Sequence, residues 1–203
     1  MAGKRQAARG ERRARLVAAA QRVFGEKGYH GATVDDLTRA AGVAKGTFYL
    51  YFDEKRDLFY EVIQGFFQLI LEIAGSVRRP PRAGLDFVAE AERAAGELMR
   101  VFLENRELAR LAHRDSMGLD AELEKMVQGF YRELADLEAK NIRLGIELGL
   151  VRDDVDPLLV GYAHIGMVER ALLQLLDDPG SLPPPDEFVR QMVRLAFQGL
   201  VRS

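Results

Sequence analysis

Residues 33–55 read TVDDLTRAAGVAKGTFYLYFDEK, and this stretch decides how the first quarter of the chain folds. Thr33 is a favoured N-cap. Asp35 and Asp36 follow in the first turn, where carboxylates interact favourably with the positive end of the helix dipole. Gly42 stands where that helix must stop in a left-handed conformation, which glycine adopts without steric strain. A second short helix is predicted over residues 44–50. The pattern indicates two helices joined at a tight corner, the geometry that places a helix in the DNA major groove.

Each of the two short helices has a predicted packing face. In the first helix this face contains Leu37, Ala40 and Ala41, and the small alanines allow a second helix to approach closely. In the second helix, Phe48 and Phe52 are expected to point inward at helical spacing. The outward-facing side chains are then Lys45, Thr47, Tyr49 and Tyr51.

Gly46 lies on the exposed face of the second helix, where glycine costs about 1 kcal/mol of helix propensity relative to alanine. A glycine at this position is useful if the backbone approaches phosphate or base edges closely. The exposed tyrosines beside it also favour a binding surface over a merely solvated one. The alternative interpretation is an ordinary helical hairpin inside an all-α core.

Charge is distributed unevenly along the 203 residues. Residues 1–56 contain 12 Lys and Arg against 6 Asp and Glu, a net charge of +6, whereas the rest of the chain has a net charge of −8. A basic end on an acidic body is expected when only that end binds phosphate. Residues 1–10 are predicted to form a disordered basic arm, which either stays solvated or reaches a minor groove.

Over residues 11–63 the chain resembles the N-terminal domain of the tetracycline-repressor (TetR) family of bacterial transcription regulators. The matched stretch covers about a quarter of the chain, and beyond it the resemblance rests on length and helical character. In the family, the first helix supports a helix-turn-helix formed by the second and third, and the fourth leads to a ligand-binding domain. The matching residues are Ala18–Ala20, Val23, Phe24, Gly28, Tyr29, Thr33, Val34, Leu37, Ala41–Tyr49, Tyr51, Phe52, Lys55, Leu58 and Phe59.

The resemblance implies that residues 11–56 form a DNA-binding domain whose partner is a double-stranded operator. Thr33 and Lys55 are expected to contact phosphate, Thr33 with the help of its helix N-terminus. Leu50 stands where the family often has a polar or aromatic residue, and it contacts either a thymine methyl group or a sugar. The residues expected to enter the major groove are Lys45, Gly46, Thr47, Tyr49 and Tyr51.

Apolar spacing and turn signals predict helices along the whole chain, about nine in total, and no strand pattern stands out. The fold class is therefore all-α, with an N-terminal three-helix helix-turn-helix domain followed by a larger helical ligand-binding and dimerisation domain over residues 57–203. Besides the two short helices, the predicted helices cover residues 11–27, 53–77, 84–104, 106–115, 119–149, 158–176 and 186–201.

A small-molecule effector is expected to bind among the helices from residue 53 to residue 176. Asn141 interrupts an otherwise apolar seam, so it needs a partner in another helix, in water or in a ligand. His164 lies on a very apolar helix, where it is either a satisfied core histidine or a polar contact in a cavity. The candidate lining residues, each with core packing as its alternative, are Phe66, Phe102, Phe130, Tyr131, Asn141 and His164.

The helix predicted over residues 158–176 has almost no polar face. A helix that is apolar all round must be buried all round, which in a chain of this length favours a second copy as partner. Similar proteins form a four-helix dimer interface from their last two helices, and residues 158–176 and 186–201 fit that role. The candidate interface residues are Glu169, Arg170, Leu173, Met192 and Phe197, with Glu169 and Arg170 as a cross-dimer pair.

Other features narrow the possible function classes. The absence of cysteine excludes disulfides and thiolate metal sites, which is typical of cytoplasmic proteins. The three histidines occur in no metal-binding spacing, and neither a nucleophile elbow nor a phosphate-binding glycine-rich loop appears, so no metal, cofactor or enzymatic activity is predicted. No uninterrupted apolar run of about eighteen residues indicates a membrane span, and no apolar segment typical of a secretory signal follows the basic N-terminus.

The sequence therefore predicts a ligand-responsive DNA-binding transcriptional regulator. Its most specific form is a homodimeric repressor that is released from a near-palindromic operator by a small, largely apolar effector. The alternatives are an all-α small-molecule-binding protein without DNA function and a purely structural helical adaptor. Neither alternative has a reason to separate basic from acidic residues as this chain does.

Overall fold

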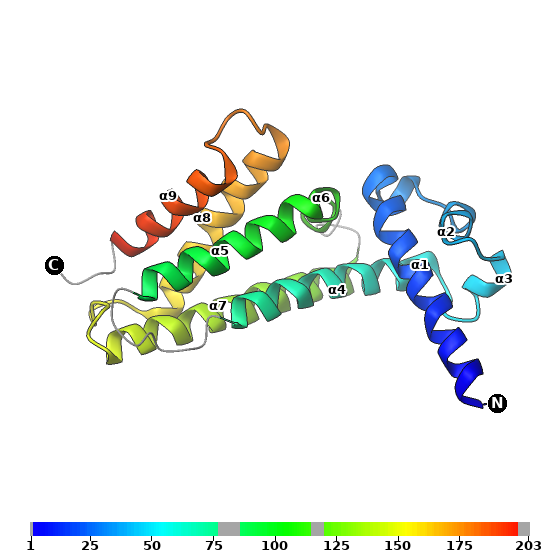
Figure 1. Ribbon diagram of the computed structural model, residues 1–203, viewed down its shortest axis with the longest axis horizontal. Coiled ribbons are helices and arrows are strands. Elements are labelled where there is room, and N and C mark those ends of the chain that lie inside the picture. The colour runs from blue at the N-terminus through cyan, green and yellow to red at the C-terminus, as the bar shows by residue number, and fades with distance from the viewer. Residues whose placement is uncertain (1, 77–85, 115–119, 199–203) are drawn as a thin grey trace. The chain divides into compact units, whose positions relative to one another are not determined.

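A computed structural model describes residues 2–76, 86–114 and 120–198, and every regular element in these ranges is an α-helix (Figure 1). The predicted all-α class is confirmed, and the described part of the chain contains nine helices. They are α1 (Ala2–Gly31), α2 (Val34–Ala41), α3 (Lys45–Phe48), α4 (Lys55–Gly75), α5 (Asp86–Glu104), α6 (Arg106–Arg114), α7 (Ala121–Glu147), α8 (Pro157–Asp177) and α9 (Pro185–Gln198).

The ends of two helices differ from the sequence expectation. Helix α1 begins at Ala2, where a disordered arm is predicted, and α3 ends at Phe48 instead of residue 50. Gly28, directly after the predicted helix end at residue 27, leaves the helical path with a φ of 71°, and one further turn follows before α1 ends.

The chain folds into two compact units. Unit 1 contains Met1–Phe67 and Glu107–Lys125, and unit 2 contains Gln68–Arg106 and Met126–Ser203. The predicted boundary after residue 56 places residues 107–125 in the second domain, because their sequence carries no sign that they pack on the first. Helix α6 approaches α1 so closely that a Cβ atom on Gly25 would lie 2.9 Å from the Cβ atom of Glu107.

Unit 1 is built around a core that fixes α2 and α3 against α1 and α4. The rings of Phe24 and Phe59 meet edge to face with their centroids 5.3 Å apart. Burying each such side chain stabilises the fold by about 1.5–3 kcal/mol. This core gives the helix-turn-helix a stiff support, and its fully buried members are Leu16, Ala20, Phe24, Leu37, Phe48, Leu58, Phe59, Val62 and Ile63.

The corner between α2 and α3 has the predicted caps. The Thr33 hydroxyl accepts a hydrogen bond from the Asp36 N–H, and the Asp36 carboxylate accepts one from the Thr33 N–H, which completes a capping box. Gly42 ends α2 in the left-handed region at φ 64° and ψ 38°. The Val43 N–H then donates to the Thr38 carbonyl at 3.0 Å and closes the corner.

One residue on the packing face of α2 was predicted wrongly. Ala40 is exposed, and Thr38 is buried beside Leu37 and Ala41 in its place. A threonine can occupy this position because its hydroxyl donates to the Val34 carbonyl at 2.9 Å within the same helix. The hydroxyl therefore needs no partner outside α2.

In unit 2, α7 and α8 pack together at a point of close backbone approach. A Cβ atom on Gly161 would lie 2.9 Å from the Ala135 carbonyl oxygen, so only glycine fits there without a shift of the helices. Beside this point, the Tyr131 hydroxyl donates to the Glu169 carboxylate and His164 Nδ1 lies 3.1 Å from Glu138 Oε1. The two helices are thus joined by polar contacts as well as by packing.

Helix α4 is long and apolar enough to cross a membrane by length and composition alone. The core helix of a globular unit passes the same test. In this chain Leu58, Phe59, Val62 and Ile63 of α4 are fully buried in unit 1, which accounts for the apolar composition of its first half.

Candidate nucleic-acid interface

The segment formed by α3 and the turn after it presents one exposed face and one buried face. Phe48 is fully buried and Phe52 is 5% exposed, so both anchor the segment as predicted. Tyr49 is 52% exposed, and Lys45 and Gly46 are exposed as well. The predicted outward direction of these three residues is therefore seen in the structure, whereas Thr47 is half-buried.

Lys45 is held in place by α2. Its ammonium nitrogen lies 3.0 Å from Asp35 Oδ1, and both side chains are more than half exposed. The hydrogen bond to Asp35 raises the pKa of Lys45, with the Coulomb attraction of the same carboxylate as the second cause. Exposed ion pairs of this kind contribute little to stability, so Lys45 can exchange Asp35 for a phosphate or base edge at small cost.

The N-terminal half of α1 borders the same surface. The Arg9 guanidinium lies 5.7 Å from the ring centroid of Tyr51, which is half-buried, and the Arg13 guanidinium lies 5.5 Å from the ring centroid of Phe52. Arg13 also forms two 2.6 Å hydrogen bonds to Glu61. Arg9 and Arg13 are not among the predicted site residues, because only the fold brings α1 beside the turn after α3.

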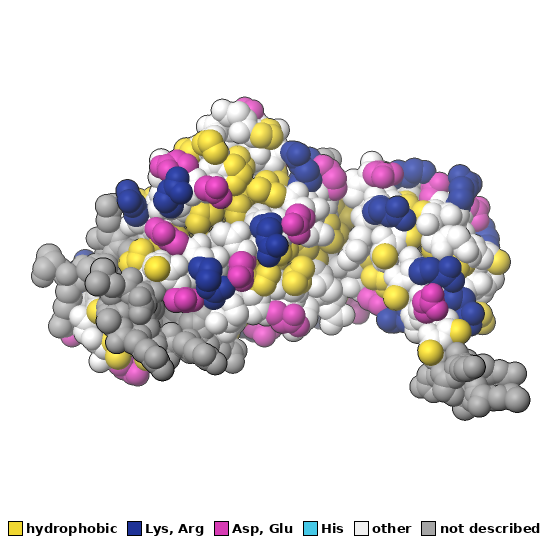
Figure 2. All heavy atoms as spheres, in the orientation of Figure 1, with side chains coloured by type: hydrophobic (Ala, Val, Ile, Leu, Met, Phe, Trp, Pro, Cys, Tyr) yellow, Lys and Arg dark blue, Asp and Glu magenta, His cyan; other side chains and the backbone are white. Residues whose placement is uncertain are grey.

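Exposed basic side chains are also found on α1 and α2 of unit 1. Figure 2 shows Lys and Arg side chains spread over the visible face of unit 1. Arg12, Arg15, Arg22 and Arg39 are all exposed. Such residues attract the DNA backbone without reading its sequence, and they supply the salt-dependent part of the affinity.

Thr33 is less available to phosphate than its sequence position suggests. Its hydroxyl donates to Asp36 Oδ2 at 2.7 Å and accepts from the Asp36 N–H at 3.1 Å. The residue primarily caps α2. A phosphate contact through the hydroxyl requires the donor bond to Asp36 to break first.

Lys55 differs most clearly from the sequence expectation. Its ammonium group donates to the carbonyl oxygens of Tyr29 and Ala32, each at 2.7 Å, and lies 4.4 Å from the ring centroid of Tyr29. Two of the three N–H donors are thus used inside unit 1, where they join the end of α1 to the start of α4. Lys55 therefore has a structural role in unit 1, and its predicted contact with phosphate stays a prediction.

Replacing Lys55 with methionine is expected to destabilise unit 1 by about 1–3 kcal/mol, because two carbonyl groups lose a charged donor. Methionine retains the apolar stem over Tyr29. The measurement is urea unfolding, with Lys125→Met, an exposed lysine of α7, as the matched control. Unchanged stability together with weaker DNA binding would show that Lys55 contacts phosphate and does not stabilise unit 1.

Asp36 makes the stability of the corner depend on pH. Its hydrogen bond with Lys27, whose ammonium lies 2.7 Å from Oδ1, and then its bonds with Thr33 hold the pKa of Asp36 well below the ordinary value of 3.8. A carboxylate with a lowered pKa stabilises the fold above the unfolded pKa, and this stabilisation is lost as the pH falls through the folded pKa.

The variant Asp36→Asn is therefore expected to have a lower melting temperature than the wild type above about pH 5. The difference between the two proteins is expected to shrink as the pH falls below 3.8. Thermal unfolding at several pH values measures this, with Asp136→Asn on α7 as the control for loss of one exposed carboxylate. A difference that stays constant down to low pH would show that Asp36 acts through its cap geometry alone.

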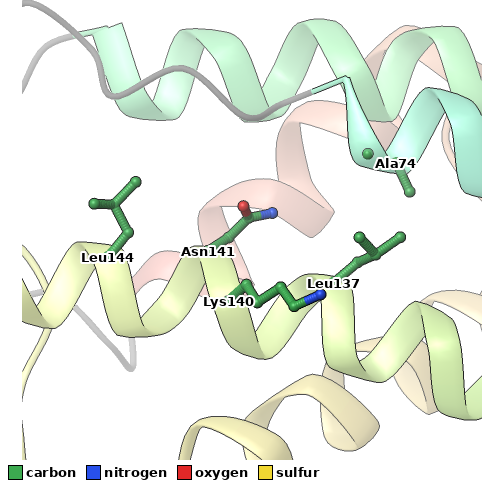
Figure 3. Close-up of a pocket in the computed structure, with 6 residues that line it drawn as sticks. Ala74, Leu137, Lys140, Asn141 and Leu144 are labelled. Carbon is green, nitrogen blue, oxygen red and sulfur yellow. The ribbon is translucent and has the colours of Figure 1, made fainter.

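One of the candidate effector residues, Asn141, borders a described hollow in unit 2. A hollow of about 310 Å³ lies between the end of α4 and the middle of α7, and Figure 3 shows Asn141 among the residues that border it. Its lining consists of Ala74, Gly75, Leu137, Lys140, Asn141 and Leu144. Asn141 is the only predicted effector residue in this lining, whereas Leu137 and Leu144 stand in the same apolar seam.

The other predicted effector residues do not line this hollow. Phe66 and Phe130 are buried, and Phe102 is half-buried. Tyr131 is bonded to Glu169, and burial, followed by that hydrogen bond, raises the pKa of its hydroxyl. His164 contacts Glu138. Neither Tyr131 nor His164 lines the described hollow; both take part in contacts between α7 and α8, and their effector role stays a prediction.

Helix α8 carries an exposed stripe, here defined as six residues spaced by three and four. The first five are exposed and the last is half-buried, so the helix is not covered all round within a single chain. Leu159 alone is 69% exposed. The members of the α8 stripe are Leu159, Tyr162, Ala163, Gly166, Arg170 and Leu173.

The remaining predicted interface residues differ in their exposure and contacts. Glu169 lies beside the α8 stripe and accepts a hydrogen bond from Tyr131 of the same chain, and its predicted pair with Arg170 across the dimer stays a prediction. Met192 on α9 is half-buried, and the side chain of Phe197 lies outside the described part of the chain. Leu195 on α9, which the prediction omitted, is 58% exposed.

A three-helix unit with a rigid core, a capped corner and an exposed Lys-Gly-x-x-Tyr face defines a helix-turn-helix DNA-binding protein. Among the residues that the structure describes, no three His, Asp or Glu side chains converge as metal ligands do.

Comparison with known proteins identifies the family. The model of the bacterial regulatory proteins of the tetR family matches residues 16–62. The chain is 28% identical over 196 residues to the uncharacterized HTH-type transcriptional regulator YdgC of Bacillus subtilis, covering 94% of this chain and 93% of the relative. It is also 28% identical over 197 residues to the HTH-type transcriptional repressor DhaR of a Mycobacterium species, with the same coverage.

A solved structure extends the likeness to the whole fold. The regulator FadR from Bacillus subtilis, in complex with stearoyl-CoA, superposes with a TM-score of 0.76 at 19% identity, covering 91% of this chain and 97% of that chain. Residues 16–62 carry the N-terminal domain of the tetR family of bacterial regulatory proteins, and nearly the whole chain is similar to regulators of this type. It is a DNA-binding transcriptional regulator and not an enzyme, which also excludes the small-molecule binder without DNA function.

Proposed function

We propose that the chain is a cytoplasmic homodimeric repressor that binds a near-palindromic operator and leaves it when a small, largely apolar effector binds. The observation that carries the proposal is the exposed face of Lys45, Gly46 and Tyr49 on the buried anchor Phe48. These residues would enter the major groove, with Thr47 and Tyr51 at the edges. Exposed arginines of α1 and α2 would contact phosphates.

The α8 stripe supports the homodimer. An exposed row that includes leucine, tyrosine and two small residues allows two copies of α8 to pack closely, and a two-fold axis pairs the row with itself. Helix α9 would complete the interface through Met192 and Leu195. The dimer would place α3 of one copy about 34 Å from α3 of the other, which is one turn of DNA. The operator would therefore have to be nearly palindromic.

The hollow beside Asn141 supports a small effector. Leu137, Leu144 and Ala74 supply apolar lining, and Asn141 and Lys140 supply polar groups that would orient a ligand. Helix α4 contributes residues to both units, so a ligand beside Ala74 contacts the helix that continues into the DNA-binding unit. Release requires the ligand to favour the free state over the DNA-bound state by about 5 kcal/mol.

The first experiment is selection of bound DNA from a random pool, followed by titration of the winning site at several salt concentrations. A near-palindromic winner whose affinity falls steeply with salt is expected, because each neutralised phosphate adds to the slope. Absence of any enrichment from refolded, ligand-free protein would contradict the proposal.

The effector is tested on the complex with that operator. Because FadR of Bacillus subtilis was solved with stearoyl-CoA, long-chain acyl-CoA thioesters are the first compounds to add, with free coenzyme A as control. Release by a compound, and loss of that response in Asn141→Leu with unchanged DNA affinity, are the expected results. A response that Asn141→Leu retains would place the effector site outside the described hollow.

A further inference from the structure

Leu50 is the most exposed large hydrophobic side chain in the described part of unit 1. It is 68% exposed, and Tyr49, its neighbour on the same face, is the other such residue there. An exposed leucine beside a tyrosine that faces the groove is apolar surface that the folded unit itself does not cover. A bound partner with an apolar group would cover it.

The backbone holds Leu50 on the exposed side of the segment. The Leu50 N–H donates to the Thr47 carbonyl at 3.3 Å and the Tyr51 N–H to the Phe48 carbonyl at 2.9 Å, so the chain continues past the end of α3 in a 3₁₀-like turn. Gly46 and Leu50 are both exposed, whereas Phe48 between them is fully buried.

Gly46 leaves the side of Leu50 open. A helical side chain leans over the turn that precedes it, which for Leu50 is the turn that contains Gly46. A Cβ atom built on Gly46 meets no other atom within 4 Å. The surface beside Gly46 is therefore open and Leu50 is itself 68% exposed, so a group projecting from a base can approach both residues.

The chemistry of leucine limits what that group is. Leucine offers no hydrogen bond, so it distinguishes bases only by apolar contact. In the major groove the apolar group that differs between base pairs is the C5 methyl of thymine. A sugar is the other apolar partner in reach of DNA-binding residues, but it carries no information about sequence.

We propose that Leu50 determines sequence specificity by contacting the C5 methyl group of one thymine in each operator half-site. The inference rests on the proposed DNA-binding function and adds a base-reading residue to it. Lys45 and Tyr49 would hold the segment in the groove, and Leu50 would then select thymine over cytosine and over uracil at one position.

The test replaces each thymine of the selected operator, symmetrically in both half-sites, with deoxyuridine. This change removes one methyl group and leaves base pairing intact. At one position the wild type is expected to lose about fourfold in affinity per half-site, or about fifteenfold for the dimer, which corresponds to one buried methyl group on each side.

Two variants assign the effect to the leucine. Leu50→Ala is expected to bind the thymine and deoxyuridine operators equally at that position, whereas Leu50→Met, which keeps an apolar side chain of similar length, retains most of the difference. Because Leu50 is exposed, both variants are expected to unfold at the wild-type temperature, and thermal unfolding checks this.

Three outcomes overturn the inference while the DNA-binding function stands. In the first, the wild type binds the thymine and deoxyuridine operators equally at every position. In the second, Leu50→Ala keeps both wild-type affinities and so their ratio. In the third, Leu50→Ala binds both operators more weakly while the ratio of the two affinities persists, as a sugar contact predicts. A chain that selects no operator at all refutes the proposed function and this inference with it.

Discussion

Replacing Tyr49 with alanine is expected to lower affinity for the selected operator about a thousandfold while the fold and the dimer stay intact. A groove contact typically contributes about 1–3 kcal/mol, and the dimer uses it twice, so about 4 kcal/mol is lost. Tyr49 is 52% exposed, so its removal leaves no cavity in the core. The ring of Tyr49 lies 5.2 Å from that of Phe48, centroid to centroid, and the substitution removes this ring contact.

Operator titration measures the loss, and thermal unfolding and size-exclusion chromatography verify the fold and the dimer. The variant Tyr49→Phe serves as the matched control, since it keeps the ring and removes only the hydroxyl. If Tyr49→Phe binds like the wild type, the ring is the reading group; if it binds like Tyr49→Ala, the hydroxyl is. A Tyr49→Ala protein that melts several degrees lower would show that Tyr49 supports the fold instead.

Replacing Gly166 with glutamate is expected to convert the protein to monomers and to weaken operator binding at the same time. Gly166 lies in the middle of the α8 stripe, and a Cβ atom on it meets no other atom within 4 Å in the single chain. A two-fold interface would bring the two glutamates near each other and bury both. Burying unpaired charge costs about 3–5 kcal/mol, which weakens the dimer more than a hundredfold.

The protomer itself is expected to tolerate the change, because glutamate is a better helix former than glycine. Gly129→Glu is the matched control: Gly129 is exposed on α7, and a Cβ atom there also meets nothing within 4 Å. Size-exclusion chromatography with light scattering gives the oligomeric state of both variants. A Gly166→Glu protein that remains dimeric would move the interface away from the α8 stripe.

Most helices could be predicted because their signals are local. The Thr33 capping box spans three residues, and Gly42 ends α2 through its own backbone conformation. Helix α8 begins at Pro157, directly after the cap Asp156 and one residue before the predicted start at residue 158. Helix α1 was predicted too short, because nothing in its first residues marks where the helix begins.

The exposed part of the candidate site could also be predicted, since the helical period separates Tyr49 from Phe48 without reference to the rest of the chain. Lys55 could not be placed in the same way. Its hydrogen-bond partners are the carbonyls of Tyr29 and Ala32, more than twenty residues earlier, and no local pattern relates a lysine to a distant backbone group.

The sequence by itself determined the all-α class, the helix-turn-helix and which side chains of α3 are exposed, because caps, glycine conformation and helical periodicity act within a few residues. Only the tertiary structure decided which side chains are already used. It pairs Glu169 with Tyr131, thirty-eight residues away, and places Arg13 on Glu61 and Phe52. Such pairings depend on how helices pack, and packing is set by shape complementarity between segments that the periodicity of each helix does not encode.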